Sequence, residues 1–200
     1  MATKRIATPK EVSESYRAYT AVIGELIWAS NYCYGEFEIL FCHVATQTEF
    51  PIGRAVWHAS LSDGARLQML AAATEVSGRL SKKIRTNILW VVEKAQKLAE
   101  SRNDAAHSLI VVSRVNPAKV AISQHGTKPK RYARLESKLD LKKHYRLVGA
   151  DLWRLGTYVR ALWSRVAGFD DLPPLLRRPR LVSVPRNNQK NDLVNFSLRV

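Results

Sequence analysis

The chain has 200 residues, 46% of them hydrophobic, so it is long enough for one well-packed core and short for two. Its 32 Lys and Arg against 17 Asp and Glu give a formal net charge of +15, which favours polyanionic partners such as nucleic acid over the alternative of a generally basic surface. Two cysteines and the lack of an 18-residue apolar run exclude a disulfide scaffold and a membrane span. We therefore expect a cytoplasmic protein with no membrane contact.

Helical periodicity dominates the first half of the chain. Thr8–Glu11 has the pattern of a capping box with Pro at the first helical position, and the apolar seam that follows continues to Val44. Pro51 is expected to stop this long helix, whose extra apolar residues indicate a central position in the fold. The four helices predicted in this half lie at about 9–44, 52–60, 63–77 and 80–108.

The periodicity then changes. β-Branched residues at 109–115 and 120–124, around a turn at 116–119, predict a β-hairpin, and 130–134 is expected to form a third edge strand. The last helix is predicted over about 137–167, with an unbroken apolar seam typical of bundle packing. A Pro- and Arg-rich segment follows it.

Together these elements predict a mainly α fold: a bundle of four main helices with an inserted β-hairpin at about 109–135 and an extended basic C-terminal arm. We expect the helical domain to occupy 1–170 and the arm 171–200, partly ordered by packing on the bundle or on a partner.

One charged residue interrupts the apolar seam of the fourth helix. Continuing the four-three spacing places Arg102 where an aliphatic side chain is expected. A guanidinium there needs an anion, a carboxylate or water. Glu36 and Glu38 of the first helix are the candidate carboxylates if the two helices lie side by side, although solvated carboxylates are the more common case.

The run RNDAAH at 102–107, late in a helix of a helical chain, resembles the hallmark motif of the HEPN family. The resemblance covers about residues 10–167 in layout and these six residues in motif detail. It implies a small all-helical bundle that works as a homodimer, with the two motifs facing each other. It also implies a metal-independent ribonuclease of the toxin or antiviral-defence kind, with an antitoxin or defence-system protein as a further partner.

These residue types suit cleavage of RNA by attack of a 2′-hydroxyl on the adjacent phosphate. His107 can act as general base or acid near neutral pH, and the Arg102 guanidinium can donate two hydrogen bonds to phosphate. Asn103, four residues before His107, shares its helix face and can orient the ring. No metal or other cofactor is expected, because the other histidines lack paired ligand spacing and no carboxylates cluster.

Helical geometry limits how this site can be built. Residues five apart on an unbroken helix are separated by about 140°, so Arg102 and His107 do not point together. Either the last turn distorts, or a two-fold dimer brings the Arg of one chain to the His of the other. Asp104 between them can orient Arg102 or repel substrate. Structural roles also remain open: a snorkelling Arg and a His at the C-terminal dipole.

The basic insert supplies candidate contacts to nucleic acid, with cations for phosphates and one aromatic ring for a base. These residues are Lys128, Lys130, Arg131, Tyr132 and Arg134. A solvated cationic edge that discourages sheet aggregation accounts for the same residues. Two other functions stay open on this sequence: a non-catalytic nucleic-acid-binding module, and an assembly component whose basic arm follows nucleic acid or a partner protein.

Overall fold

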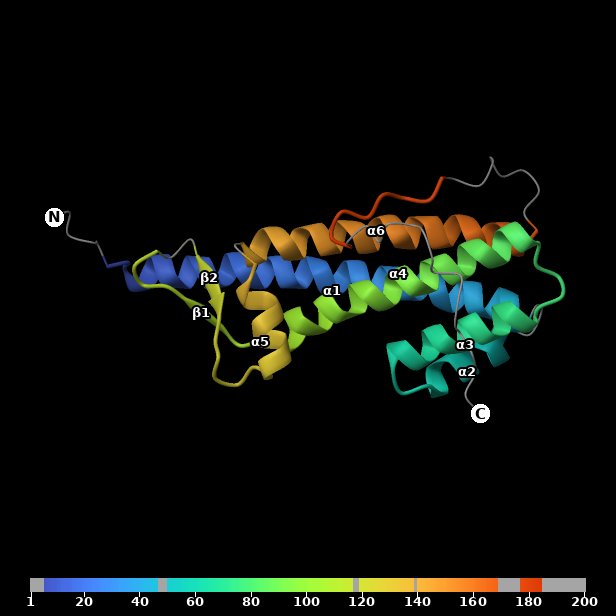
Figure 1. The fold of residues 1–200 in the computed structure, drawn as a ribbon, viewed down its shortest axis with the longest axis horizontal. Helices are drawn as coiled ribbons and strands as arrows, with labels where there is room; N and C mark the ends of the chain where they lie inside the picture. The colour runs from blue at the N-terminus through green and yellow to red at the C-terminus, as the bar shows by residue number, and fades with distance from the viewer. Residues whose placement is uncertain (1–5, 47–49, 117–118, 139, 169–176, 185–200) are drawn as a thin grey trace.

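The computed structural model describes residues 6–46, 50–116, 119–138, 140–168 and 177–184, and within these ranges it is mainly helical with a small antiparallel hairpin, as predicted (Figure 1). The elements are α1 (Pro9–Ala45), α2 (Phe50–Ala59), α3 (Asp63–Val76), α4 (Lys82–His107), β1 (Ile110–Val112), β2 (Val120–Ile122), α5 (Pro129–Glu136) and α6 (Leu141–Val166).

Helices α1 and α6 lie side by side along the long axis of the molecule, and α4 packs across them (Figure 1). Helices α2 and α3 cover one end of this layer, while the hairpin and α5 lie near the other end, beside the C-terminus of α4. The seams predicted from periodicity form the core between these helices. Its fully buried members include Leu26, Cys33, Phe37, Leu40, Ile88, Val91, Leu98, Tyr145, Leu152, Leu155 and Val159.

Local signals begin α1 as the sequence predicts. The backbone N–H of Thr8 donates to Glu11 Oε2 over 2.7 Å, and the Thr8 hydroxyl accepts from the backbone N–H of Glu11, which completes the capping box. The helix ends at Ala45, before Pro51. That proline instead lies in the first turn of α2, where its missing N–H costs nothing, so its predicted role as the helix stop is wrong.

A glycine allows α1 and α6 to approach closely. A Cβ added to Gly156 of α6 would lie 2.7 Å from Cε1 of Tyr32 and 3.1 Å from Cα of Cys33, both on α1. Any larger residue would therefore push the two helices apart. Cys33 and Cys42 are both buried free thiols on α1.

The segment 130–134, predicted as a third strand, is part of helix α5. Pro129 occupies the first helical position and Leu135 is the buried apolar anchor of this helix. Among the residues that the structure describes, the sheet therefore has the two strands β1 and β2, with Ile110 opposite Ile122. Because α5 ends near Ser137, the last helix begins later than predicted, at Leu141 behind an Asp140 cap.

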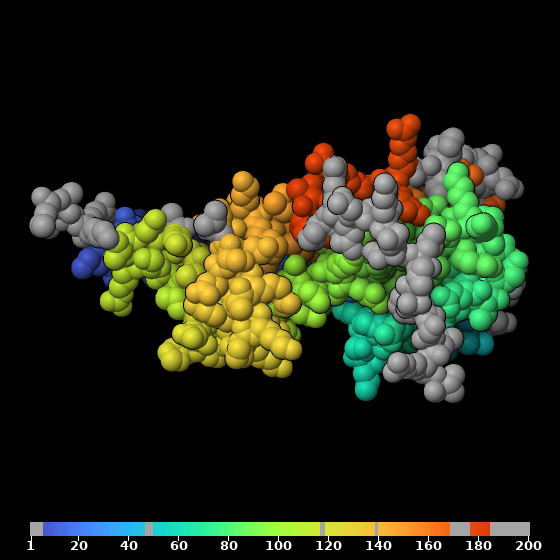
Figure 2. Space-filling view, viewed as in Figure 1, coloured from blue at the N-terminus to red at the C-terminus, as the bar shows by residue number. Residues whose placement is uncertain are grey.

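Part of the predicted arm packs on the bundle of its own chain. The backbone N–H and the hydroxyl of Ser183 both donate to Asp151 Oδ2 over 2.6 Å. Arg178 donates to Asn87 Oδ1 over 2.8 Å and lies 5.2 Å above the ring of Trp90. Figure 2 shows 177–184 in red along this face. The rest of the arm, 171–176 and 185–200, lies outside the described residues.

No helix in the described ranges is both long enough and apolar enough to cross a bilayer.

Candidate functional site

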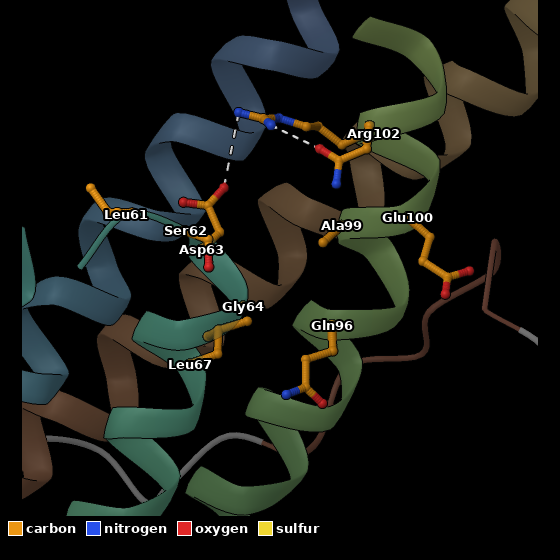
Figure 3. A pocket seen from close by; sticks show the side chains of 10 residues that line it. Leu61, Ser62, Asp63, Gly64, Leu67, Gln96, Ala99, Glu100 and Arg102 are labelled. Atoms are coloured by element: carbon orange, nitrogen blue, oxygen red, sulfur yellow. Dashed lines mark hydrogen bonds and ion pairs between the residues drawn. The ribbon is translucent and has the colours of Figure 1, made fainter. Parts of the chain in front are cut away.

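The C-terminal third of α4 places Arg102 and Asn103 at an open groove. The helix begins at a Ser81 cap and buries its seam as far as Leu98 and Ala105. Between α4 and the start of α3 lies a groove of about 490 Å³, here called the α3–α4 groove (Figure 3). It is lined by Leu61, Ser62, Asp63, Gly64, Leu67, Gln96, Ala99, Glu100, Arg102 and Asn103. The surface in Figure 2 is hollowed between the α3 and α5 regions.

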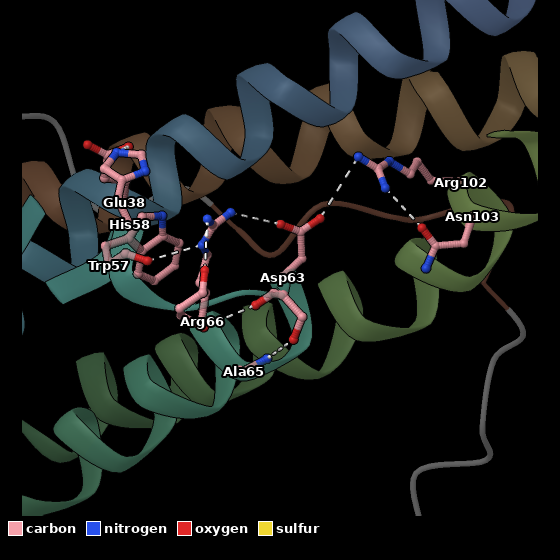
Figure 4. Close-up of polar contacts among 10 residues, drawn as sticks. Glu38, Trp57, His58, Asp63, Ala65, Arg66, Arg102 and Asn103 are labelled. Atoms are coloured by element: carbon pink, nitrogen blue, oxygen red, sulfur yellow. Dashed lines mark hydrogen bonds and ion pairs between the residues drawn. The ribbon is translucent and has the colours of Figure 1, made fainter. Parts of the chain in front are cut away.

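Arg102 is held at the wall of this groove with its hydrogen-bonding capacity only partly used. Its Nη1 donates to Asn103 Oδ1 over 2.9 Å, and its Nη2 lies 4.0 Å from Asp63 Oδ2 (Figure 4). Its Nε is buried and has no hydrogen-bond partner among the described residues. The side chain is 27% exposed and lines the groove, so the remaining N–H donors of its two terminal nitrogens can bind an anion there.

The carboxylate nearest to Arg102 is Asp63, so the predicted partners Glu36 and Glu38 are wrong. Glu36 is buried towards α6, where its Oε1 accepts from Arg160 and its Oε2 from the indole of Trp163. Glu38 turns to α2. Both point away because α1 packs its other faces against α6 and α2.

Asp63 is shared between two guanidiniums. Its Oδ1 accepts from Arg66 over 3.2 Å, while Oδ2 faces Arg102 (Figure 4). The buried Tyr34 hydroxyl, which has no hydrogen-bond partner in the described part of the chain, belongs to the same electrostatic environment. Burial raises the pKa of Tyr34, the charge of Asp63 raises it further, and Arg102 and Arg66 oppose the rise. Tyr34 is therefore a neutral donor at physiological pH.

His107 lies outside this groove. Helix α4 stays regular to His107, so the last turn does not distort and the two motif side chains diverge within one chain. The His107 side chain is exposed. The predicted hydrogen bond from Asn103 to its ring is not formed among the described residues; Asn103 Oδ1 instead accepts from Arg102.

Asp104 anchors α5 rather than acting on Arg102. This side chain is 2% exposed and accepts from Arg131 Nε over 3.1 Å and from Arg134 Nε over 2.7 Å. Arg131 also donates to the backbone carbonyl of His107. The two arginines therefore hold α5 against the last turn of α4.

The structure thus divides the predicted nucleic-acid contacts into two groups. Lys128 and Lys130 are exposed, whereas Arg131 and Arg134 bond to Asp104, and the Tyr132 hydroxyl donates to Glu136 over 3.0 Å. Sequence reasoning missed Asp63, Tyr34 and the groove. The spacing of Gln96, Glu100 and Asn103 beside the seam was the available signal for a second, polar stripe on α4.

Comparisons with protein-family models, with curated proteins and with solved structures give no match for this chain. We therefore infer a function from the geometry of its own residues. Within the described ranges, no three His, Cys, Asp or Glu side chains are grouped so that they could hold a metal ion.

Proposed function

We propose that the chain is a metal-independent endoribonuclease of the HEPN type, built as a homodimer. The observation that carries the proposal is Arg102: a guanidinium on the core-facing seam, with a buried unpartnered Nε and its nearest carboxylate 4.0 Å away, at the wall of an open groove. Incomplete pairing of a partly buried cation is typical of a site that receives an anion.

Each motif residue has a role in this proposal. Arg102 holds the scissile phosphate and stabilises the charge of the transition state. His107 takes the proton from the 2′-hydroxyl or returns one to the leaving oxygen. Asn103 fixes the guanidinium of Arg102, to which it is hydrogen-bonded, rather than the imidazole.

The divergence of the two side chains supports a composite site. Arg102 and His107 point about 140° apart on a regular helix, so one chain alone does not bring them to the same phosphate. A two-fold axis near the end of α4 would pair the Arg of each chain with the His of the other. The exposed Ala106 beside His107 leaves room for such an approach. A toxin or antiviral-defence role with a neighbouring regulator belongs to the same proposal.

The test incubates the purified full chain with end-labelled RNA in EDTA. We expect wild type to leave cyclic-phosphate ends, and both His107→Ala and Arg102→Ala to lose about 100-fold or more of the cleavage rate. His125→Ala is the matched control, because His125 is also exposed but lies on the loop after β2. Wild-type protein that binds RNA and leaves it intact would overturn the proposal.

Mixing the two inactive variants tests the composite site. If subunits exchange at random, half of the dimers are mixed, and each mixed dimer has one intact Arg-His pair, so about a quarter of the activity should return. Recovery to no more than the level of the single variants would show that the site lies within one chain.

A second candidate is a non-catalytic nucleic-acid-binding module, favoured by the exposed Lys128 and Lys130 and by the net charge of +15. It predicts that Lys128→Glu together with Lys130→Glu weakens RNA binding about tenfold or more, while His107→Ala leaves binding and cellular function unchanged. Loss of function in His107→Ala at unchanged RNA affinity would exclude this candidate.

A further inference from the structure

Three aromatic rings form a continuous stack across the line where α1 meets α6. The ring centroids of Tyr32 and Trp153 lie 4.2 Å apart, and those of Trp28 and Trp153 lie 5.0 Å apart at an interplanar angle of 17°. Trp153 of α6 therefore lies between two rings of α1. At one end of the stack, the guanidinium of Arg160 lies 5.3 Å from the centre of the Tyr32 ring.

The surrounding residues hold this stack in place. The Tyr32 ring lies so close to Gly156 that a Cβ there would meet it at 2.7 Å. Arg160 is fixed in turn by the buried Glu36. The rings are thus ordered before any ligand arrives, which lowers the entropic cost of binding.

The other end of the stack is open to solvent. Trp28 is 63% exposed and Trp153 is 42% exposed, although both are large apolar side chains. Beside them lies a cleft of about 300 Å³, here called the α1–α6 cleft. Glu25 and the exposed Arg146 also line it, so the cleft offers one aromatic wall, one anion and one cation.

The chemistry of this cleft fits an unpaired nucleobase on a charged strand. An indole face stacks on any base, and a guanidinium beside it can pair with the strand's phosphate. Glu25 can accept hydrogen bonds from base amino or imino groups. Arg146 and the net charge of +15 favour an anionic occupant of this cleft over a second copy of the basic chain, whose proposed two-fold contact lies near the end of α4.

We propose that the α1–α6 cleft binds single-stranded nucleic acid, with Trp28 stacking on an unpaired base and Arg146 pairing with the adjacent phosphate. Bases in a duplex are already stacked and paired, so the cleft selects single strands. This site is separate from the Arg102–His107 motif and does not depend on whether the chain cleaves RNA.

The test measures equilibrium binding of a fluorescent 2′-O-methyl oligonucleotide, which lacks the 2′-hydroxyl needed for cleavage, as a single strand and as a duplex. We expect Trp28→Ala to weaken single-strand binding about tenfold or more and to leave duplex binding unchanged, with Trp28→Phe close to wild type. Tyr16→Ala is the matched aromatic control, because Tyr16 is a 40% exposed ring elsewhere on α1.

Two charge-reversal variants distinguish a specific contact in the cleft from the attraction of the overall positive charge. Arg146→Glu and Arg180→Glu change the net charge equally and both residues are exposed, but only Arg146 lines the cleft. The proposal requires a larger loss for Arg146→Glu. It is overturned if the two variants weaken binding equally, if Trp28→Ala binds as wild type, or if Trp28→Ala instead dissociates a dimer of the free protein.

The two proposals fail separately. His107→Ala should retain the single-strand affinity, and Trp28→Ala should retain cleavage of a dinucleotide too short to bridge the two sites. Thermal unfolding followed by circular dichroism checks the fold of Trp28→Ala, which removes a mostly exposed side chain and should leave the midpoint nearly unchanged.

Discussion

Asp104 determines where α5 lies, and through α5 the surroundings of the motif. Its carboxylate is 2% exposed and accepts hydrogen bonds from both Arg131 and Arg134. A buried carboxylate that receives two guanidiniums offsets its desolvation through these charge-assisted bonds. Removing the charge leaves both arginines without that partner beside an apolar core.

Asp104→Asn should lower the free energy of unfolding by about 1–3 kcal/mol, because it removes the charge that a buried side chain offers to two partly exposed guanidiniums while keeping the volume of the side chain. Glu100→Gln removes the 67% exposed partner of Arg134 and should cost less than about 1 kcal/mol. Urea unfolding of both variants measures the difference. Equal losses would mean that the surface pair holds α5 as firmly as Asp104 does.

The two thiols of α1 should be unreactive in the folded protein. Cys33 and Cys42 are each 0% exposed, and burial raises the pKa of both, so little thiolate forms at neutral pH. We expect Ellman's reagent to react with neither thiol at pH 8 and with both in urea. Rapid reaction of one thiol in native protein would show that α1 opens locally on that timescale.

At the scale of elements, the packing of α1 on α6 depends on one glycine more than on the others. Gly156→Ala should destabilise the protein by about 1–3 kcal/mol, because the added Cβ would lie 3.1 Å from the backbone of Cys33. Gly35→Ala, which places its Cβ in open space on the same pair of helices, should instead stabilise by about 0.5–1 kcal/mol. Opposite shifts of the thermal midpoint would confirm both.

Apolar periodicity predicted the long helices well, since each buries a seam that repeats with the helical period. It failed for α5. This eight-residue helix buries only Leu135, and its position depends on pairing with Asp104, a contact between segments far apart in the chain. The same limit applies to Arg102: its place on the seam was readable, but its neighbour Asp63 follows from how α3 packs on α4.

At the scale of the whole molecule, buried tyrosine and cysteine side chains that stay protonated make the folded state less stable at alkaline pH. Burial raises the pKa of Tyr19 to about 12, and it also raises the pKa of Tyr34, Tyr145 and Cys33. The unfolded chain loses these protons near pH 8.5–10, before the folded chain does. Stability is therefore fully present below about pH 8.5 and falls as the pH rises above it.

Urea unfolding at pH 7, 9 and 10.5 measures this loss. Each buried group should lower the free energy of unfolding by about 1.4 kcal/mol per pH unit between its unfolded and folded pKa. The part of the tyrosinate absorbance that comes from the buried Tyr19 and Tyr145 should rise together with unfolding. Tyrosinate that forms fully by pH 10.5 in a still-folded chain would contradict the assignment.

The pairing of α1 with α6 also affects how the chain emerges from the ribosome. About 95 residues separate the end of α1 at Ala45 from the start of α6 at Leu141. At roughly 5–20 residues per second, translation needs about 5–20 s to cover that distance. During this interval α6 has not yet been synthesised and cannot cover the apolar face of α1. A ribosome-associated chaperone should therefore bind nascent α1 first.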